Sequence, residues 1–361
     1  MPRERAHPIR VRPRESAAAV LVLLLGIVVA GCASTAGRHP EPSPAVVSPR
    51  PASAVLSVDP WEFAGKSGRV IRTPWYRLFT TETDPALLDT LPEFLEAALD
   101  HYTTALAILP RPEMRLDTFL MATRPQWQAL TIQVMGAANA GTYLRIERGG
   151  FSAGGRALLW SIGPRDTLAI AAHEGWHQYT QRTFRQWLPA WLEEGIAAYM
   201  EGFVADPRDP RRPIFAPWAN VERFDQLRAA TARGELMPLD ELLRVSPQEL
   251  IRTSTERTLT YYAQVWALVH FLRDADGARH RAPLTVLLND AALGRLEGAL
   301  EPVYGSAAAH RIVLLRQGPA VFTTYFDADL PAAGAAYDEF VARITAGSRD
   351  VILAGRSPLE P

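Results

Sequence analysis

The sequence predicts an α+β fold, in which an N-terminal mixed sheet with flanking helices precedes a mostly helical half. Three observations support this prediction. Segments rich in aromatic and β-branched residues cluster before residue 163. From about residue 164 onward, apolar residues recur mostly at the helical spacing of about 3.6 residues. The composition, with 48% hydrophobic and 21% charged residues, is that of an ordinary globular chain that can bury a core.

The N-terminal half contains candidate strands and helices in alternation. Strands are expected at residues 75–81, 114–122, 141–147 and 156–162. A helix is expected to begin at Thr83-Asp84-Pro85, because Asp or Thr caps a first turn and Pro fits inside it. That helix is expected to continue to Pro110, and a second one should cover residues 123–135. Together, residues 61–163 are predicted to form an N-terminal α/β subdomain.

The C-terminal half, residues 164–361, is predicted to be a helical subdomain. Helices are expected over residues 166–183, 189–203, 258–272, 283–293 and 332–345, and a Pro-rich loop over residues 205–217. The first two of these helices carry the motifs described below. An active site is therefore expected in the cleft between the two halves.

The N-terminus has the pattern of a secretory signal. Residues 1–15 carry five arginines, and the apolar stretch over residues 17–30 is shorter than the roughly 20 residues of a membrane-spanning helix. This stretch ends in Val29-Ala30-Gly31-Cys32, which resembles a bacterial lipobox. The resemblance implies that residues 1–31 are removed and that Cys32 is acylated. A plain signal peptide, or an uncleaved anchor with an incidental cysteine, is the alternative.

The lipobox implies attachment to a membrane in the cell envelope. Acyl chains on Cys32 anchor a chain stably when more than one is present. Ala33, as a residue other than Asp after the cysteine, implies the periplasmic face of the outer membrane if the cell is Gram-negative. Residues 32–60 are rich in Pro, Ser and Ala and are expected to form a tether.

The net charge argues against a general nucleic-acid binder, and the cysteine content excludes a disulfide-stabilised fold. The formal net charge is −1, which gives the protein no general attraction to nucleic acid. Cys32 is the one cysteine of the chain, so an internal disulfide is impossible. The sequence does not indicate an oligomeric state.

The segment His173-Glu174-Gly175-Trp176-His177 has the pattern HExxH. Residues four apart lie on one face of a helix, so His173 and His177 can present two imidazoles to one zinc ion. Glu174 lies about 100° further round the helix, outside the ligand set but close enough to accept a proton from a metal-activated water. The alternative is a core or surface helix with two unrelated histidines.

A catalytic zinc ion also requires a third protein ligand and an open position. The second motif, residues 189–199, offers Glu193 and Glu194 on another helix. Residues 178–193 are long enough to end the first helix and return a second one beside it. Adjacent residues on a helix cannot both point at one metal ion, so the other glutamate is expected outside the ligand set or on the surface.

The two motifs together resemble the gluzincin metallopeptidases, the zincin-fold clan of thermolysin, and most closely the uncharacterised DUF1570-like, peptidase-MA-like bacterial proteins. The resemblance rests on HExxH followed by W-L-x-E-G-x-A-x-Y, here Trp191 to Tyr199. It implies a zinc metallopeptidase in which His173, His177 and Glu194 bind Zn²⁺ and Glu174 is the catalytic base.

A third segment, Thr258 to Leu272, resembles the family's Y-A-x-S-W-A-L-V helix. In related enzymes a tyrosine at its head donates a hydrogen bond to the developing oxyanion, which implies this role for Tyr262, or for its neighbour Tyr261. A tyrosine that only packs in the core is the alternative. Val265 stands where the family usually has a small polar residue, and His270 is expected to be a core or surface histidine.

A peptide or protein is the implied substrate. Gluzincins bind extended peptides along an edge strand, and residues 156–162 are expected to form that strand. The glycine-rich residues 149–155 either allow a substrate backbone to approach or simply connect a hairpin. Two other functions stay open: a lipid-anchored zincin-fold protein that binds a partner without catalysis, and a zinc hydrolase that acts on non-peptide substrates.

Overall fold

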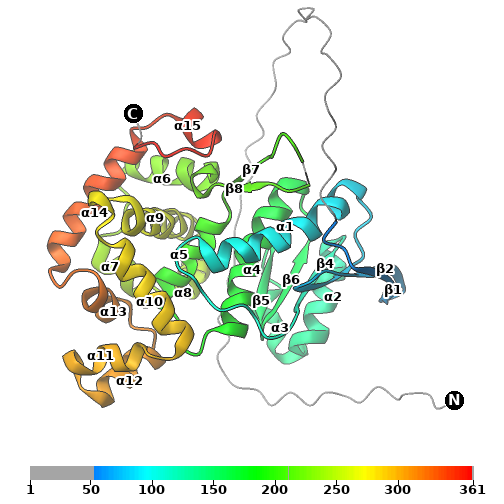
Figure 1. Ribbon diagram of the computed structural model, residues 1–361, viewed down its shortest axis with the longest axis horizontal. Coiled ribbons are helices and arrows are strands. Elements are labelled where there is room, and N and C mark those ends of the chain that lie inside the picture. Colours follow the sequence, from blue (N-terminus) through cyan, green and yellow to red (C-terminus); the bar gives the residue numbers. More distant parts are fainter. Residues whose placement is uncertain (1–52, 210, 360–361) are drawn as a thin grey trace, which may run out of the picture.

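A computed structural model describes residues 53–209 and 211–359 of the protein. Figure 1 shows a sheet with its helices in one half of the molecule and a group of helices in the other. The predicted α+β class is confirmed, because a mixed six-stranded sheet comes first and a mostly helical half follows. Residues 1–52, with the predicted signal peptide and Cys32, lie outside the described residues.

The sheet has the strand order β1-β2-β3-β4-β6-β5. Strands β3, β4 and β6 run parallel, whereas β1, β2 and β5 are antiparallel to their neighbours. The strands are β1 (Ser57–Phe63), β2 (Lys66–Arg72), β3 (Tyr76–Thr80), β4 (Leu116–Met121), β5 (Gly150–Ala153) and β6 (Arg156–Trp160).

Both faces of the sheet are covered. On β6, the adjacent residues Leu158 and Leu159 point to opposite faces, as the pleat of a strand requires. Leu159 joins the main core with α1 (Pro85–Thr104) and α4 (Pro164–Thr183). Leu158 joins a smaller group beneath α2 (Arg124–Met135) and α3 (Ala137–Tyr143). We call this group the sheet-side cluster; it consists of Phe63, Met121, Trp127, Leu130, Tyr143, Ile146, Phe151, Leu158 and Trp160.

The strand predicted over residues 141–147 is wrong. The chain forms α3 up to Tyr143 and then a turn. Tyr143 and Ile146 are three residues apart, so both reach the sheet-side cluster from a helix end and the turn that follows, and the ring of Tyr143 lies 4.2 Å from that of Phe151. A helix end and a turn bury these two side chains as well as a strand would. The aromatic and β-branched residues of this segment therefore did not distinguish a strand from the observed structure.

Three strands of the six-stranded sheet, β1, β2 and β5, were not predicted, and they change where the sheet ends. β1 begins at Ser57, so the sheet starts inside the stretch that was assigned to the tether. The glycine-rich residues 149–155 form β5 and a tight turn at Gly154 and Gly155, both of which have positive φ. β5 pairs with β6 and lies at the end of the sheet. The prediction that residues 156–162 form the edge strand is therefore wrong.

The helical half contains the predicted helices and several shorter ones. It comprises α5 (Ala190–Met200), α6 (Val221–Arg233), α7 (Leu239–Arg244), α8 (Pro247–Thr253), α9 (Thr255–Asp274), α10 (Arg281–Leu293), α11 (Leu296–Tyr304), α12 (Ser306–Leu314), α13 (Gly318–Tyr325), α14 (Leu330–Thr345) and α15 (Arg349–Leu353). Two 3₁₀ turns, Pro217–Ala219 and Asp276–Ala278, and the short ribbon of β7 (Phe203–Val204) and β8 (Ile214–Phe215) connect them. Within the described chain, no helix combines the length and apolar character that crossing a bilayer requires.

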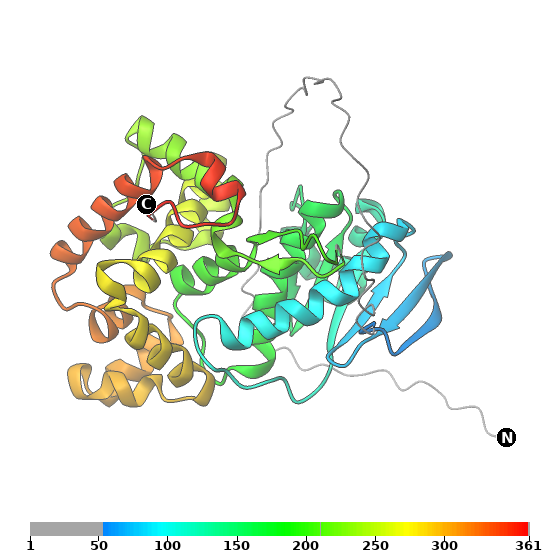
Figure 2. The ribbon, with the colours of Figure 1, turned by 45° about the horizontal axis from the view of Figure 1, so that its top comes forward.

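Helices α5 and α9 pack closely in the middle of the helical half, seen from a second side in Figure 2. Gly195 of α5 makes this approach possible. A Cβ atom at that position would lie 2.6 Å from the main-chain oxygen of Val265 and 2.9 Å from a methyl group of Val269. Because the Val265 oxygen is main chain, a side chain at position 195 would force the two helices apart.

Replacing Gly195 with alanine should therefore lower the free energy of unfolding by about 1–3 kcal/mol, the usual cost of overpacking. Gly298 in α11 is the matched control, because a Cβ atom there would meet nothing within 4 Å. Gly298→Ala should raise stability by up to about 1 kcal/mol through helix propensity. Urea denaturation followed by circular dichroism measures both effects, and equal stability of the two variants would contradict the packing described for Gly195.

Candidate metal centre

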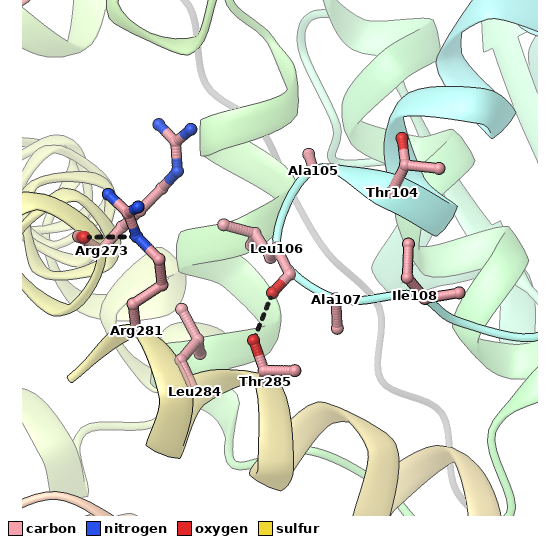
Figure 3. A pocket seen from close by; sticks show the side chains of 9 residues that line it. All are labelled: Thr104, Ala105, Leu106, Ala107, Ile108, Arg273, Arg281, Leu284 and Thr285. Atoms are coloured by element: carbon pink, nitrogen blue, oxygen red, sulfur yellow. Dashed lines mark hydrogen bonds between the residues drawn. The ribbon is translucent and has the colours of Figure 1, made fainter.

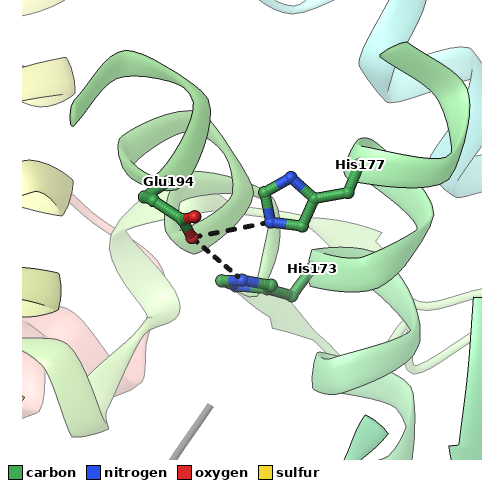
Figure 4. Close-up of side chains that lie close together, drawn as sticks. All are labelled: His173, His177 and Glu194. Carbon is green, nitrogen blue, oxygen red and sulfur yellow. Dashed lines mark ion pairs between the residues drawn. The ribbon is translucent and has the colours of Figure 1, made fainter. Parts of the chain in front are cut away.

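Two neighbouring helices bring two imidazoles and one carboxylate together (Figure 4). His173 and His177 lie one turn apart on α4, and Glu194 faces them from α5. The Oε2 atom of Glu194 is 3.7 Å from Nε2 of His173 and 3.6 Å from Nε2 of His177. One ligand atom from each residue lies within 4.8 Å of the other two, so the group could hold a metal ion.

The spacing and the unpaired atoms of this group fit a tetrahedral ion. Ligand atoms that lie about 2.1 Å from a tetrahedral zinc ion are about 3.4 Å from one another. Both Nε2 atoms and Oε2 of Glu194 are buried, and they have no hydrogen-bond partner within residues 53–209 and 211–359. Buried polar atoms without a partner are costly, and a cation would satisfy all three at once.

The buried charge around the group also favours a cation. Four carboxylates are almost completely buried here, with exposed fractions of 0% for Glu174, 5% for Glu193, 3% for Glu194 and 8% for Glu201. Glu201 pairs with the guanidinium of Arg223, which is fully buried too. Neutral imidazoles would leave this cluster with excess negative charge in a medium of low dielectric constant, which a divalent cation would offset.

The position of α4 depends on close contact with α1. The Tyr102 hydroxyl of α1 donates a hydrogen bond to the carbonyl oxygen of Ala172, at 2.7 Å. A Cβ atom at position 175 would lie 2.5 Å from the same hydroxyl oxygen, so a glycine is required inside the HExxH segment. This contact holds the motif helix against the sheet half, while α5 and its Glu194 belong to the helical half.

Carboxylates outside the ligand set orient both imidazoles. Nδ1 of His173 lies 2.7 Å from Oε1 of Glu201, and Nδ1 of His177 lies 3.0 Å from Oε1 of Glu193. The hydroxyl of Thr180 also donates to Oε1 of Glu193, at 2.7 Å. A carboxylate at Nδ1 keeps a proton on that nitrogen and directs the Nε2 lone pair toward a metal.

Glu201 is held in turn by α6 and the residue before it. Arg223 donates to both carboxylate oxygens of Glu201, with N–O distances of 2.9 and 3.2 Å, and Asn220 donates to one of them at 2.8 Å. The guanidinium of Arg223 also lies over the ring of Tyr262, 5.2 Å from its centroid. One continuous set of contacts therefore joins His173 to Glu201, Arg223 and Tyr262.

The carboxylates determine where protons are held when no metal is bound. Burial alone lowers the pKa of His177, but Glu194 and Glu193 outweigh burial and raise that pKa to about 10. The pKa of His173 is also raised: burial lowers it, but the nearby carboxylates of Glu194 and Glu201 outweigh that effect. For Glu194 the balance is reversed: burial raises its pKa, but the two imidazoles lower it to about 2.

Glu174 is the fourth residue of the site, and its environment differs from that of Glu194. Its side chain is fully buried, and neither carboxylate oxygen has a hydrogen-bond partner among the described residues. Burial raises the pKa of Glu174. The Ser152 hydroxyl on β5 donates to the main-chain oxygen of Glu174 at 2.6 Å and so connects the edge strand to this turn of α4. An unpaired carboxyl group beside the ligand set is suited to accept a proton.

Tyr261 and Tyr262 both lie near the head of α9, with buried hydroxyl groups that have no partner among the described residues. The ring centroid of Tyr262 is 6.2 Å from that of His173, and the ring of Tyr261 stands edge-on to that of Tyr262. Burial raises the pKa of both phenols well above 10, so both remain protonated hydrogen-bond donors at neutral pH. Tyr262 is the one whose ring lies next to a ligand.

The other residues considered from the sequence lie elsewhere. Trp191 packs against Phe322 and Phe326, and His270 is buried with its ring stacked on Trp218. The remaining described histidines that the sequence left without a role, His101, His280 and His310, do not join the ligand group.

Three residues of the site were missed by sequence reasoning. Glu201 caps the end of α5 and follows Glu194 by seven residues, about two helical turns, so spacing alone provided a usable signal. Arg223 and Ser152 carry no local signal. They reach the site because α6 packs on α9 and because β5 lies beside α4.

Residues 167–291 match the model of a family described as "Protein of unknown function (DUF1570)". The match covers most of α4 and all of α5 and α9, and so includes the two imidazoles, the four clustered glutamates and both tyrosines. The resemblance inferred from the motifs is supported to this extent. No curated protein and no solved structure matches the chain.

Metal binding should release protons from this site. With a pKa of about 10, His177 carries a proton at pH 7 that must leave before its Nε2 atom can bind a cation. Raising the pH removes this competition, so affinity should increase with pH up to about pH 10. Calorimetric titration of zinc at pH 7, in buffers of different ionisation enthalpy, measures the number of protons released; a value near zero would contradict the assigned protonation of His177.

Proposed function

We propose that this protein is a zinc-dependent peptidase. The observation that carries the proposal is a buried His173–His177–Glu194 group with three unpaired ligand atoms, beside the unpaired carboxyl group of Glu174. Two nitrogen ligands and one oxygen ligand are a set typical of catalytic zinc, which keeps its fourth position for water or substrate. Closed structural zinc sites usually have four protein ligands instead.

The reaction that fits this arrangement is hydrolysis of a peptide bond. A bound zinc ion would act as a Lewis acid that activates water and polarises the scissile carbonyl group. Glu174 would accept the proton of the attacking water and pass it to the leaving amine nitrogen, a transfer that a carboxyl group with a raised pKa favours. The Tyr262 hydroxyl would donate a hydrogen bond to the carbonyl oxygen as negative charge develops there.

We infer that an extended peptide would pair with β5 rather than with β6. β5 is the end strand of the sheet, and its Ser152 touches the turn of α4 that carries Glu174. Phe151 and Ser152 of β5 are 0% and 1% exposed, so a peptide could reach this edge only after the movement described below. A strand added antiparallel or parallel to β5 would then gain main-chain hydrogen bonds without requiring a particular side chain. Gly150 allows β5 to lie close to β6, because a Cβ atom there would collide with the main-chain oxygen of Leu158.

We also propose that the mature protein is held in the cell envelope by a lipid on Cys32. The basic segment, the apolar stretch and the lipobox-like tetrapeptide occur in the order that such a signal requires. Anchoring would place the peptidase at a membrane surface, facing the periplasm if the cell is Gram-negative.

Metal analysis combined with peptide digestion tests the function. Purified protein should contain about one zinc ion per chain, and His173→Ala and Glu194→Ala should each lose it. Glu174→Gln should retain zinc and lose at least about 100-fold of the chelator-sensitive cleavage of a peptide library. Glu249→Gln, a change of the same type at an exposed position of α8, is the matched control and should behave as the wild type.

The outcomes separate the alternatives. Equal zinc content in wild type, His173→Ala and Glu194→Ala would refute the metal site. Zinc in the wild type without cleavage of any peptide would favour a non-catalytic binding protein or a hydrolase of other substrates. Unchanged cleavage by Glu174→Gln would remove the proposed base.

Substrate access requires a movement, because the reactive side chains of His173, Glu174 and Tyr262 have exposed fractions of 0%. Helix α8 connects the helical half to the sheet half: it precedes α9 directly, and its Ile251 packs against the sheet-side cluster. The residues that flank α8, Ser246 and Ser254, have extended backbone conformations. Rotation at these two positions would separate Ile251 from the sheet half.

Ile251→Ser should therefore accelerate the loss of zinc to an excess of chelator. Removing a half-buried apolar contact worth about 1 kcal/mol favours opening by roughly fivefold. Ile132→Ser, the same change at a 43% exposed position of α2, is the control. Stopped-flow absorbance of the chelator reports the rate, and equal rates for the two variants would show that α8 does not limit access.

A further inference from the structure

A cavity of about 290 Å³ lies far from the metal centre, between the loop after α1 and the ends of α9 and α10 (Figure 3). Arg273, in the last turn of α9, is eleven residues beyond Tyr262, which corresponds to about 16 Å along the helix. The cavity is thus separate from the site proposed for catalysis, and nothing in the proposed reaction uses it.

Two guanidinium groups line this cavity and are poorly neutralised. Figure 3 shows the side chains of Arg273 and Arg281 on the same side of the cavity. Nε of Arg281 donates a hydrogen bond to the main-chain oxygen of Arg273, at 3.3 Å. Each guanidinium reaches Asp274 only at 3.7 Å, beyond hydrogen-bond distance, and the same carboxylate lies 3.5 Å from His270. One carboxylate therefore serves two guanidinium groups and an imidazole.

Arg273 in particular has unused donors. Its side chain is 33% exposed, and within the described part of the chain its guanidinium donates no hydrogen bond. It lies 5.8 Å from the ring centroid of Tyr199. Burial, and to a lesser extent the charge of Arg273, lower the pKa of His101 to about 4.

The opposite wall of the cavity is apolar and already fixed in place. Ala105, Leu106, Ala107 and Ile108 line it from the loop, and Leu284 lines it from α10. The Thr285 hydroxyl donates to the main-chain oxygen of Leu106 at 2.9 Å and ties the loop to α10. Ile108 is 76% exposed, so an apolar surface stands at the mouth, opposite the arginines.

We propose that this cavity binds a small organic carboxylate with an aliphatic body. The planar guanidinium donors match the two oxygens of a carboxylate, and the apolar wall would cover a short aliphatic chain. The volume is at the lower end of the range for small-molecule sites. A bare inorganic anion would use the arginines but leave the apolar wall in contact with water.

Binding of N-acetyl-leucine to the full-length protein, followed by calorimetry or ligand-observed NMR, tests this proposal. The ligand should bind at least roughly tenfold more tightly than N-acetyl-leucinamide, which lacks the charge, and than inorganic phosphate, which lacks the aliphatic body. Equal binding of the amide would overturn the carboxylate assignment, and equal binding of phosphate would reduce the site to a general anion site and overturn the proposal as stated.

Variants locate the binding and separate it from the metal centre. Arg273→Gln and Arg281→Gln should each weaken binding by roughly tenfold or more, because each removes charge-assisted hydrogen bonds. Arg295→Gln is the matched control, since Arg295 lies in the turn after α10 and pairs with Asp290. Glu194→Ala should bind as the wild type does. The fold should tolerate Arg281→Gln, because the Arg281 side chain is 58% exposed. Unchanged affinity in this variant would overturn the proposal. Loss of binding in Glu194→Ala would overturn it too.

Discussion

The structure depends on an imbalance of buried charge. Glu174, Glu193, Glu194 and Glu201 converge on two imidazoles, and the buried guanidinium of Arg223 pairs with Glu201. Isolated carboxylates are rarely buried, because the loss of solvation exceeds what one partner returns. A divalent cation would offset this negative charge by binding Glu194 and both Nε2 atoms. Glu193 and Glu201 would not touch the cation, because they accept hydrogen bonds from the Nδ1 atoms of the two imidazoles. The packing of α4, α5 and α6 and the candidate metal centre therefore depend on each other.

Two glycines make the helix packing possible. Gly175 lets the hydroxyl of Tyr102 approach α4, and Gly195 lets α5 approach the backbone of α9. Both glycines lie inside the motifs themselves, next to Glu174 and Glu194. The motifs therefore encode more than ligands, because they also encode the distances between the helices that bring the ligands together. Any residue with a Cβ atom at these positions would move a ligand helix by a substantial fraction of an ångström, and metal sites tolerate only small displacements.

The candidate metal centre is formed by both halves of the molecule. His173 and His177 lie on a helix that packs on the sheet, whereas Glu194, Glu201, Arg223 and Tyr262 come from the helical half. A relative movement of the halves would alter the site as a whole. α9 is the element most involved, because its head carries Tyr262 and its last turn carries Arg273, at the cavity lined by two arginines. The same rigid helix thus contributes to two distinct sites.

Local sequence was sufficient for the periodic elements. Asp84 does accept a hydrogen bond from the first turn of α1, and Thr123 does the same for α2, because capping requires only neighbours in the chain. The pairing of His173 with His177 likewise follows from the pitch of a helix. Residues 141–147 were assigned wrongly and β5 was not predicted, because their conformations depend on distant partners: Tyr143 packs on Phe151, and β5 pairs with β6.

The amino-acid sequence by itself determined which side chains can share one helix face, and hence the HExxH pair and the helical half. Resemblance to a family selected Glu194 over Glu193. Only the tertiary structure decided that Glu193 and Glu201 stand behind the imidazoles, that Arg223 joins them to Tyr262, and that β5 ends the sheet. The physical reason is the separation, along the chain, of the residues that make each contact. Helix geometry repeats over a few residues and can be read from spacing, whereas these contacts join residues 16 to more than 20 positions apart, whose approach depends on how whole helices pack.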